Sequence, residues 1–196
     1  QDLFECGDDD IESGDNNERD IEAEADLFSS TLLMPLDDFR RQVDGQPISF
    51  DLLGHCADRY GVSLTAAALR WTEIAPKRAV LVASRDDHML WAKSNRAALK
   101  SGAYFATRKN TIELPRDALA HSYNAFDVAD TQTGRAQSWF FREPATMPVT
   151  QMTRVAGQYD YTLTLLLMPD VEWQGARHDD EEQEEDTYDR FIRNGQ

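Results

Sequence analysis

The spacing of apolar residues predicts helices in the first part of the chain. In the segment ERDIEAEADLFSSTLLMP, residues 18–35, apolar side chains recur at i, i+4, i+7 and i+11, which is the spacing of one helical face. These residues are Ile21, Ala25, Phe28 and Leu32. Pro35 ends this helix, and PLDDFRRQV begins another with its proline near the first turn.

Two further helices are predicted in SFDLLGHCADRYGVSLTAAALRWTEIAP, residues 49–76. Gly61 stands where a left-handed C-terminal cap would end the first of them. Ser63 can cap the second, which continues until Pro76. A pair of helices joined by so short a turn has a helix-turn-helix outline.

From residue 78 the period of the pattern changes. Short runs rich in β-branched and aromatic residues alternate with turn residues such as RDD and GQYD. The runs are RAVLVAS, HMLWAKS, QSWFF, QMTRVAG and YDYTLTLLLM. They predict a small, mostly antiparallel sheet after the helices, and therefore an α+β protein.

The pattern divides the chain into four parts. We expect an acidic loop over residues 1–17, a helical part over 18–76, a β-rich domain over 77–170 and an acidic, disordered tail over 171–196. The net charge of -16 arises in the flanks, because residues 27–176 carry 16 acidic and 16 basic side chains. With 41% hydrophobic residues, the chain can build a core.

Composition also bounds the cellular setting. Cys6 and Cys56 are too few for a disulfide framework and lack the C-x-x-C spacing of a zinc site, so we expect a reduced, cytoplasmic protein. No run reaches the roughly 18 apolar residues of a membrane span. The start QDLFECGDDD has no features of a signal peptide.

Three acids in the first predicted helix are candidates for chemistry. Glu22 and Asp26 lie four residues apart on one face, whereas Glu24 points about 160° away from Glu22. Neighbouring carboxylates ionise more easily when a cation lies between them, and a metal would supply it. Acids in a first turn also favour the helix macrodipole, so spacing alone leaves both interpretations open.

The segment IEAEADLFSSTLLMP resembles the E-x-x-A-[N/D]-x-F-A-x-x-L-L-M-P signature of the ImmA/IrrE family of zinc metallo-endopeptidases. Ser29 stands where the family usually has alanine. The later ADRYGVSLTAAALRW resembles the helical continuation of that family, so the resemblance covers roughly residues 18–75. The matching positions of the signature are Glu22, Ala25, Asp26, Phe28, Leu32, Leu33, Met34 and Pro35.

The resemblance implies a zinc site. In the family, two histidines of an H-E-x-x-H helix and a downstream acid hold the metal, and the glutamate of that motif acts as general base. Alignment on the signature makes Glu22 the acid ligand, favoured over Glu24, and places Asp26 to orient a neighbouring ligand. It further implies that the partner is a helix-turn-helix repressor, cut to release transcription after a stress or mobile-element signal.

One departure from the family is large. The four histidines lie in GHCAD, DDHML, AHSYN and ARHDD, and none has a second histidine four residues away. We therefore expect the chain to be the C-terminal portion of a peptidase, inactive as it stands, with an H-E-x-x-H helix encoded upstream of Gln1. The alternative is a non-catalytic pseudo-peptidase that docks a transcriptional regulator.

The remaining motifs favour structural roles. A DNA-recognition helix needs cations, and SLTAAALRWTEIAP offers only Arg70, so we expect a helical brace and no direct nucleic-acid contact. Cys56 is interpreted as a core residue beside a surface His55, and Trp139 as a packing residue. For the β-rich part, a sensing or docking module and a purely structural cap both remain open.

Overall fold

A computed structural model describes residues 28–107, 110–122, 130–156 and 160–170. The chain divides into two compact units, Gln1–Pro35 with Gly175–Gln196, and Leu36–Gln174. Residues 28–35 are the described part of the first unit. They confirm the end of the first predicted helix, because residues 28–33 are helical and the Met34 N–H donates to the Ser30 carbonyl at 3.0 Å.

Three helices begin the second unit, as the apolar spacing predicts. They are α2 (Leu36–Val43), α3 (Phe50–Tyr60) and α4 (Leu64–Ile74). Gly61 ends α3 with a left-handed φ of 64°, and the Val62 N–H returns to the Ala57 carbonyl at 3.0 Å. The Ser63 hydroxyl then caps α4 by accepting from the Ala66 N–H at 3.1 Å. Both predicted caps are confirmed.

Buried side chains and one polar cluster hold these helices together. Phe39, Phe50 and Leu53 are at most 1% exposed. On α2, Asp38 accepts hydrogen bonds from the Tyr60 hydroxyl at 2.7 Å and from the Arg59 guanidinium at 3.2 Å. The cluster therefore fixes α2 against the C-terminal end of α3.

Arg70, the cation of the helix-turn-helix outline, points into the protein. Its side chain is 6% exposed, and its guanidinium donates to Glu73 at 3.0 Å. Its guanidinium is therefore largely shielded from a phosphate backbone. The interpretation of the helical pair as a brace stays a prediction, as does the absence of DNA binding.

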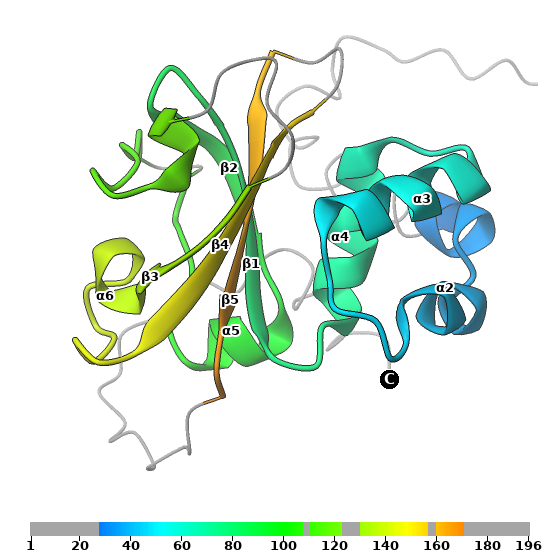
Figure 1. Ribbon diagram of the computed structural model, residues 1–196, viewed down its shortest axis with the longest axis horizontal. Coiled ribbons are helices and arrows are strands. Elements are labelled where there is room, and N and C mark those ends of the chain that lie inside the picture. The colour runs from blue at the N-terminus through cyan, green and yellow to red at the C-terminus, as the bar shows by residue number, and fades with distance from the viewer. Residues whose placement is uncertain (1–27, 108–109, 123–129, 157–159, 171–196) are drawn as a thin grey trace, which may run out of the picture. The chain divides into compact units, whose positions relative to one another are not determined.

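The sheet has five antiparallel strands in the order β2-β1-β5-β4-β3 (Figure 1). A tight turn joins β1 to β2, with positive φ of 49° at Asp86 and 62° at Asp87, and aspartate tolerates this conformation better than most residues. This is the RDD turn of the sequence pattern. The strands are β1 (Arg78–Arg85), β2 (His88–Ser94), β3 (Asp130–Arg135), β4 (Pro148–Val155) and β5 (Thr162–Met168).

Two elements differ from the sequence pattern. The run QSWFF was predicted as a strand, but Ala136–Trp139 form the short helix α6, and the Phe140 N–H donates to the Ala136 carbonyl at 2.8 Å. Strand β3 has no counterpart among the predicted runs. Its sequence DTQTGR is polar because β3 is an edge strand whose residues 131–133 are exposed, so it carries no apolar alternation.

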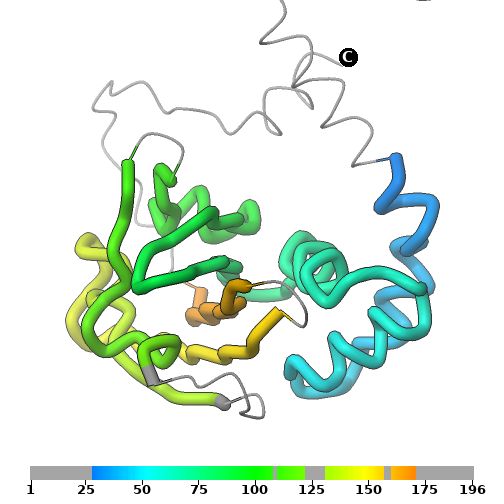
Figure 2. Tube along the Cα trace, turned by 90° about the horizontal axis from the view of Figure 1, so that it is seen from above, coloured from blue at the N-terminus to red at the C-terminus, as the bar shows by residue number. Residues whose placement is uncertain are grey.

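Both faces of the sheet are covered. Seven of the eight residues of β1 are buried, which requires packing on both sides of the strand. Helices α3 and α4 lie on one side, and α5 (Arg96–Lys100), the 3-10 helix η2 (Leu119–Ser122) and α6 on the other (Figures 1 and 2). Val80, Val82 and Leu166 face the second side, where they join Trp139 and Phe140 in one apolar cluster.

The described residues contain no helix that is long and apolar enough to cross a membrane. The predicted acidic loop and tail lie outside the described residues, so their expected structure stays a prediction, as do the four domain boundaries.

The Asp38 cluster gives a testable pKa. The Tyr60 hydroxyl, with help from Arg59, lowers the pKa of Asp38 below its ordinary value of 3.8. A lowered carboxyl pKa stabilises the fold above the ordinary value, and this stabilisation is lost as the pH falls through the folded-state pKa. The substitution Tyr60→Phe should therefore raise the Asp38 pKa towards 3.8, as measured by NMR titration of its carboxyl carbon.

An exposed tyrosine supplies the control for that titration. Tyr104 is 52% exposed and is not among the groups that shift the Asp38 pKa, so Tyr104→Phe should leave the Asp38 titration unchanged. An Asp38 pKa that is the same in the wild type and in Tyr60→Phe would contradict this assignment of the cause.

Candidate functional site

The three acids of the predicted zinc site, Glu22, Glu24 and Asp26, lie outside the described residues. Their roles therefore stay predictions. Within the described ranges, no group of three or more histidine, cysteine, aspartate or glutamate side chains could hold a metal ion.

The described end of the signature carries exposed apolar side chains. Phe28, Leu32 and Leu33 are 68%, 66% and 51% exposed. Phe28 and Leu32 belong to the apolar stripe that the spacing predicts. Large apolar groups gathered on one short helical segment are characteristic of a surface that a partner covers.

Cys56 is a structural residue, as its sequence setting predicts. The side chain is fully buried, and this burial raises the pKa of its thiol above the ordinary value of 9.0. Since a thiolate is the reactive form, the residue is a poor nucleophile. The neighbouring His55 is exposed.

His121 holds two segments together. Its Nδ1 lies 2.7 Å from the Asp87 carboxylate and its Nε2 lies 2.9 Å from the Pro115 carbonyl. Each ring nitrogen therefore has an oxygen within hydrogen-bonding distance. The contacts tie η2 to the turn between β1 and β2.

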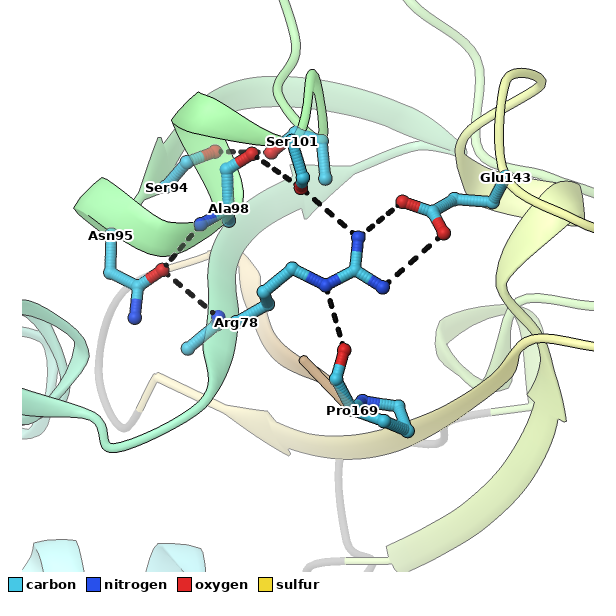
Figure 3. A network of polar contacts seen from close by, with 9 residues as sticks. Arg78, Ser94, Asn95, Ala98, Ser101, Glu143 and Pro169 are labelled. Atoms are coloured by element: carbon cyan, nitrogen blue, oxygen red, sulfur yellow. Dashed lines mark hydrogen bonds and ion pairs between the residues drawn. The ribbon is translucent and has the colours of Figure 1, made fainter. Parts of the chain in front are cut away.

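A buried polar site surrounds Arg78 at the start of β1 (Figure 3). Arg78 is 1% exposed, and its guanidinium faces both carboxylate oxygens of Glu143, which is 7% exposed. Its Nε donates to the Pro169 carbonyl at 2.7 Å, and Nη1 donates to the Ser101 hydroxyl at 3.0 Å. One arginine thereby links the ends of β1, α5 and β5 to the segment after α6.

Asn95 extends the same network to the other end of α5 (Figure 3). Its side-chain oxygen accepts from the Ala98 N–H at 2.9 Å, which caps α5, and from the Ala79 N–H of β1 at 3.2 Å. Its amide nitrogen donates to the Lys77 carbonyl at 2.7 Å. Helix α5 is therefore fixed to β1 at both of its ends.

A pocket of about 260 Å³ opens beside this network. Ser101 and Glu143 contribute to its polar wall, and Arg142 lies on the same lining. Most of the remaining lining is aromatic. The aromatic residues are Tyr104, Phe105, Trp139, Phe140 and Phe141.

Trp139 carries an unsatisfied donor. The residue is 6% exposed, and its indole Nε1 is a buried side-chain nitrogen without a hydrogen-bond partner in the described part of the chain. A buried donor left without an acceptor costs about 1–3 kcal/mol, which makes it unusual in a folded protein. The sequence identified Trp139 as a packing residue but gave no signal for the pocket or for the buried pair of Arg78 and Glu143.

Comparison with known proteins bears on the helical part. Residues 3–72 match the family model of the IrrE N-terminal-like domain, Peptidase_M78. The match includes the whole acidic signature and ends inside α4, so the sheet lies beyond it. No curated protein matches the chain.

The role of Asn95 can be tested by stability. Replacing it with alanine removes the α5 cap and leaves the buried Ala79 N–H without its side-chain acceptor. We expect Asn95→Ala to lower the free energy of unfolding by about 2–4 kcal/mol in chemical denaturation.

Ser63 gives a matched control, because it caps α4 through the Ala66 N–H and is itself exposed. Loss of that cap in Ser63→Ala should cost only about 1 kcal/mol. If the two variants lose the same stability, Asn95 acts as a cap alone and does not fix α5 to β1.

Proposed function

We propose that residues 3–72, which match the family model of the IrrE N-terminal-like domain, form the C-terminal helical part of a zinc-dependent endopeptidase. The observation that carries the proposal is the family match together with the signature from Glu22 to Pro35. Helices α2 and α3 and most of α4 follow that signature within the matched region.

In this proposal Glu22 is the acid ligand of zinc, and Asp26, one turn later on the same predicted face, orients a neighbouring ligand. Glu24 is the less favoured ligand because it points to a different side of the helix. A carboxylate is a usual zinc ligand beside two histidines.

The family's zinc chemistry needs more than one carboxylate. A catalytic zinc ion has three protein ligands and an open position, where it polarises a carbonyl and lowers the pKa of bound water to about 7. The 196 residues contain no H-E-x-x-H. In this proposal, the two histidine ligands and the general base are supplied by polypeptide outside these residues.

We propose a repressor-type transcriptional regulator as the protein substrate. The support is the resemblance to peptidases that cut helix-turn-helix repressors. The buried Arg70 is consistent with this choice, because the chain's own helix-turn-helix outline presents no cation to DNA from that position. The partner recognised is then the regulator protein and not its operator.

A non-catalytic docking protein is the second candidate. Two observations favour it: the missing H-E-x-x-H and the exposed apolar group of Phe28, Leu32 and Leu33. In this alternative the signature helix binds a regulator through its apolar face and holds no zinc.

The zinc assignment can be tested in the protein as its natural gene encodes it. We expect Glu22→Gln to lose most bound zinc and nearly all repressor cleavage, because a neutral amide is a poor replacement for a carboxylate ligand. Asp26→Asn should lower metal affinity by about 10- to 100-fold. Zinc per protein molecule is measured by elemental analysis, and cleavage by gel assay.

Glu24→Gln is the matched control, because it removes the same charge two residues away on another side of the helix. It should retain zinc and activity. Zinc content that falls in Glu24→Gln but not in Glu22→Gln would reverse the ligand assignment. A wild-type protein that binds the repressor without binding zinc would instead establish the docking function.

A further inference from the structure

We propose that the pocket beside α6 is a binding site for a small aromatic carboxylate, a planar single ring that carries one anionic group. The site belongs to the sheet part of the chain, beyond the region that matches the peptidase family. A test of this binding site is therefore independent of the zinc assignment.

The size of the pocket limits the ligand. Its volume of about 260 Å³ lies just below the roughly 300–1,000 Å³ of pockets for drug-sized molecules. A single ring with a short substituent fits such a space, since a cavity of about 150 Å³ already holds benzene.

The pocket walls favour an aromatic ring. Phe105 packs against Phe140 with ring centroids 4.9 Å apart and meets Trp139 edge-on at 6.3 Å. Tyr104 and Phe141, also in the lining, are 52% and 80% exposed. A bound ring would extend this aromatic group through stacked and edge-on contacts and would cover exposed apolar surface.

The indole of Trp139 favours a ligand with an acceptor oxygen. Its N–H lacks an acceptor among the described residues, although the ring lines the pocket. Because this nitrogen is itself closed to solvent, the Trp139 ring must shift slightly before a carboxylate oxygen can accept from the N–H, and the new hydrogen bond would then remove the cost of the unsatisfied donor. An apolar ligand would leave that cost in place.

The charges of the lining also favour an anion. Glu143 would repel one, but its carboxylate is already paired with both terminal nitrogens of Arg78. The other charged residue of the lining is Arg142, whose guanidinium carbon lies 5.4 Å from the centre of the Phe141 ring. With Glu143 neutralised, the pocket presents a net positive group beside an aromatic surface.

The polar wall is held in place before any ligand binds. Ser101 donates to the Ala98 carbonyl at 2.9 Å while it accepts from Arg78, so its hydroxyl is fixed (Figure 3). Glu143 is held by the same arginine. A preformed site avoids the entropy cost of ordering its side chains on binding.

The proposal can be tested with three matched probes on the full chain by titration calorimetry. Phenylacetate carries both the aromatic ring and the charge. Phenylacetamide keeps the aromatic ring and an acceptor oxygen but has no charge, and cyclohexylacetate keeps the charged carboxylate but has no aromatic ring. We expect phenylacetate to bind with a Kd of about 1 mM or tighter. Phenylacetamide should bind about three- to fivefold more weakly and cyclohexylacetate about two- to tenfold more weakly.

Variants then place the probe in the pocket. Arg142→Gln should weaken the binding of phenylacetate by about three- to fivefold and leave the binding of phenylacetamide unchanged. Arg96→Gln removes an exposed arginine of α5 that does not line the pocket, so it should change neither affinity. Trp139→Phe should weaken the binding of both probes by about fivefold, because the N–H donor is lost.

An NMR readout covers the case in which Trp139→Phe fails to fold. The Trp139 indole N–H resonance, assigned in the wild type through its contacts with neighbouring rings, should shift on addition of phenylacetate. Arg142→Gln, which changes an exposed side chain, provides the independent test.

Three results would overturn the proposal. One is no binding of phenylacetate up to about 10 mM, where a ligand of this size would be detected. Another is equal binding of phenylacetate and cyclohexylacetate that Arg142→Gln does not change. The last is binding of a peptide with an aromatic side chain but not of phenylacetate, which would assign the pocket to a protein partner.

Discussion

The buried pair of Arg78 and Glu143 is the interaction on which the sheet part depends. A guanidinium and a carboxylate lose several kcal/mol each when they leave water, and they remain in a protein interior only when they satisfy each other. Here the pair joins the first residue of β1 to the segment after α6, and the same arginine binds α5 through Ser101 and the end of β5 through Pro169. Four segments of the chain are thus held together by contacts with the same arginine side chain.

The pocket is a consequence of this arrangement. Because Arg78 fixes Ser101 and Glu143, the polar wall is rigid, and the aromatic residues around Trp139 complete the other side. The opposite face of the sheet is occupied by α3 and α4, which also end the region that matches the peptidase family. Helices α2, α3 and α4 and the sheet with its pocket therefore belong to one compact unit, Leu36–Gln174.

Much of the fold follows from local sequence signals. Pro35, Gly61 and Ser63 mark helix ends through backbone geometry, and the strands β1, β2 and β5 are apolar because they are central or half-buried. Strand β3 and helix α6 were not predicted, since the exposed, polar residues of β3 carry no apolar alternation and a one-turn helix has no period. The site was less predictable still: Arg78 and Glu143 are 65 residues apart, and only the folded topology brings them together. The acids Glu22, Glu24 and Asp26 were recognised through a motif, and that assignment rests on the family and not on described geometry.

A double-mutant cycle on Arg78 and Glu143 tests most directly whether this pair governs the sheet part. Arg78→Met and Glu143→Leu each leave one charge buried alone, so each should lower the free energy of unfolding by about 3–5 kcal/mol. In the double variant no charge is left unpaired, and the loss should be smaller than the sum of the single losses by about 2 kcal/mol or more. Additive losses in the double variant, or single variants that unfold like the wild type, would contradict the account.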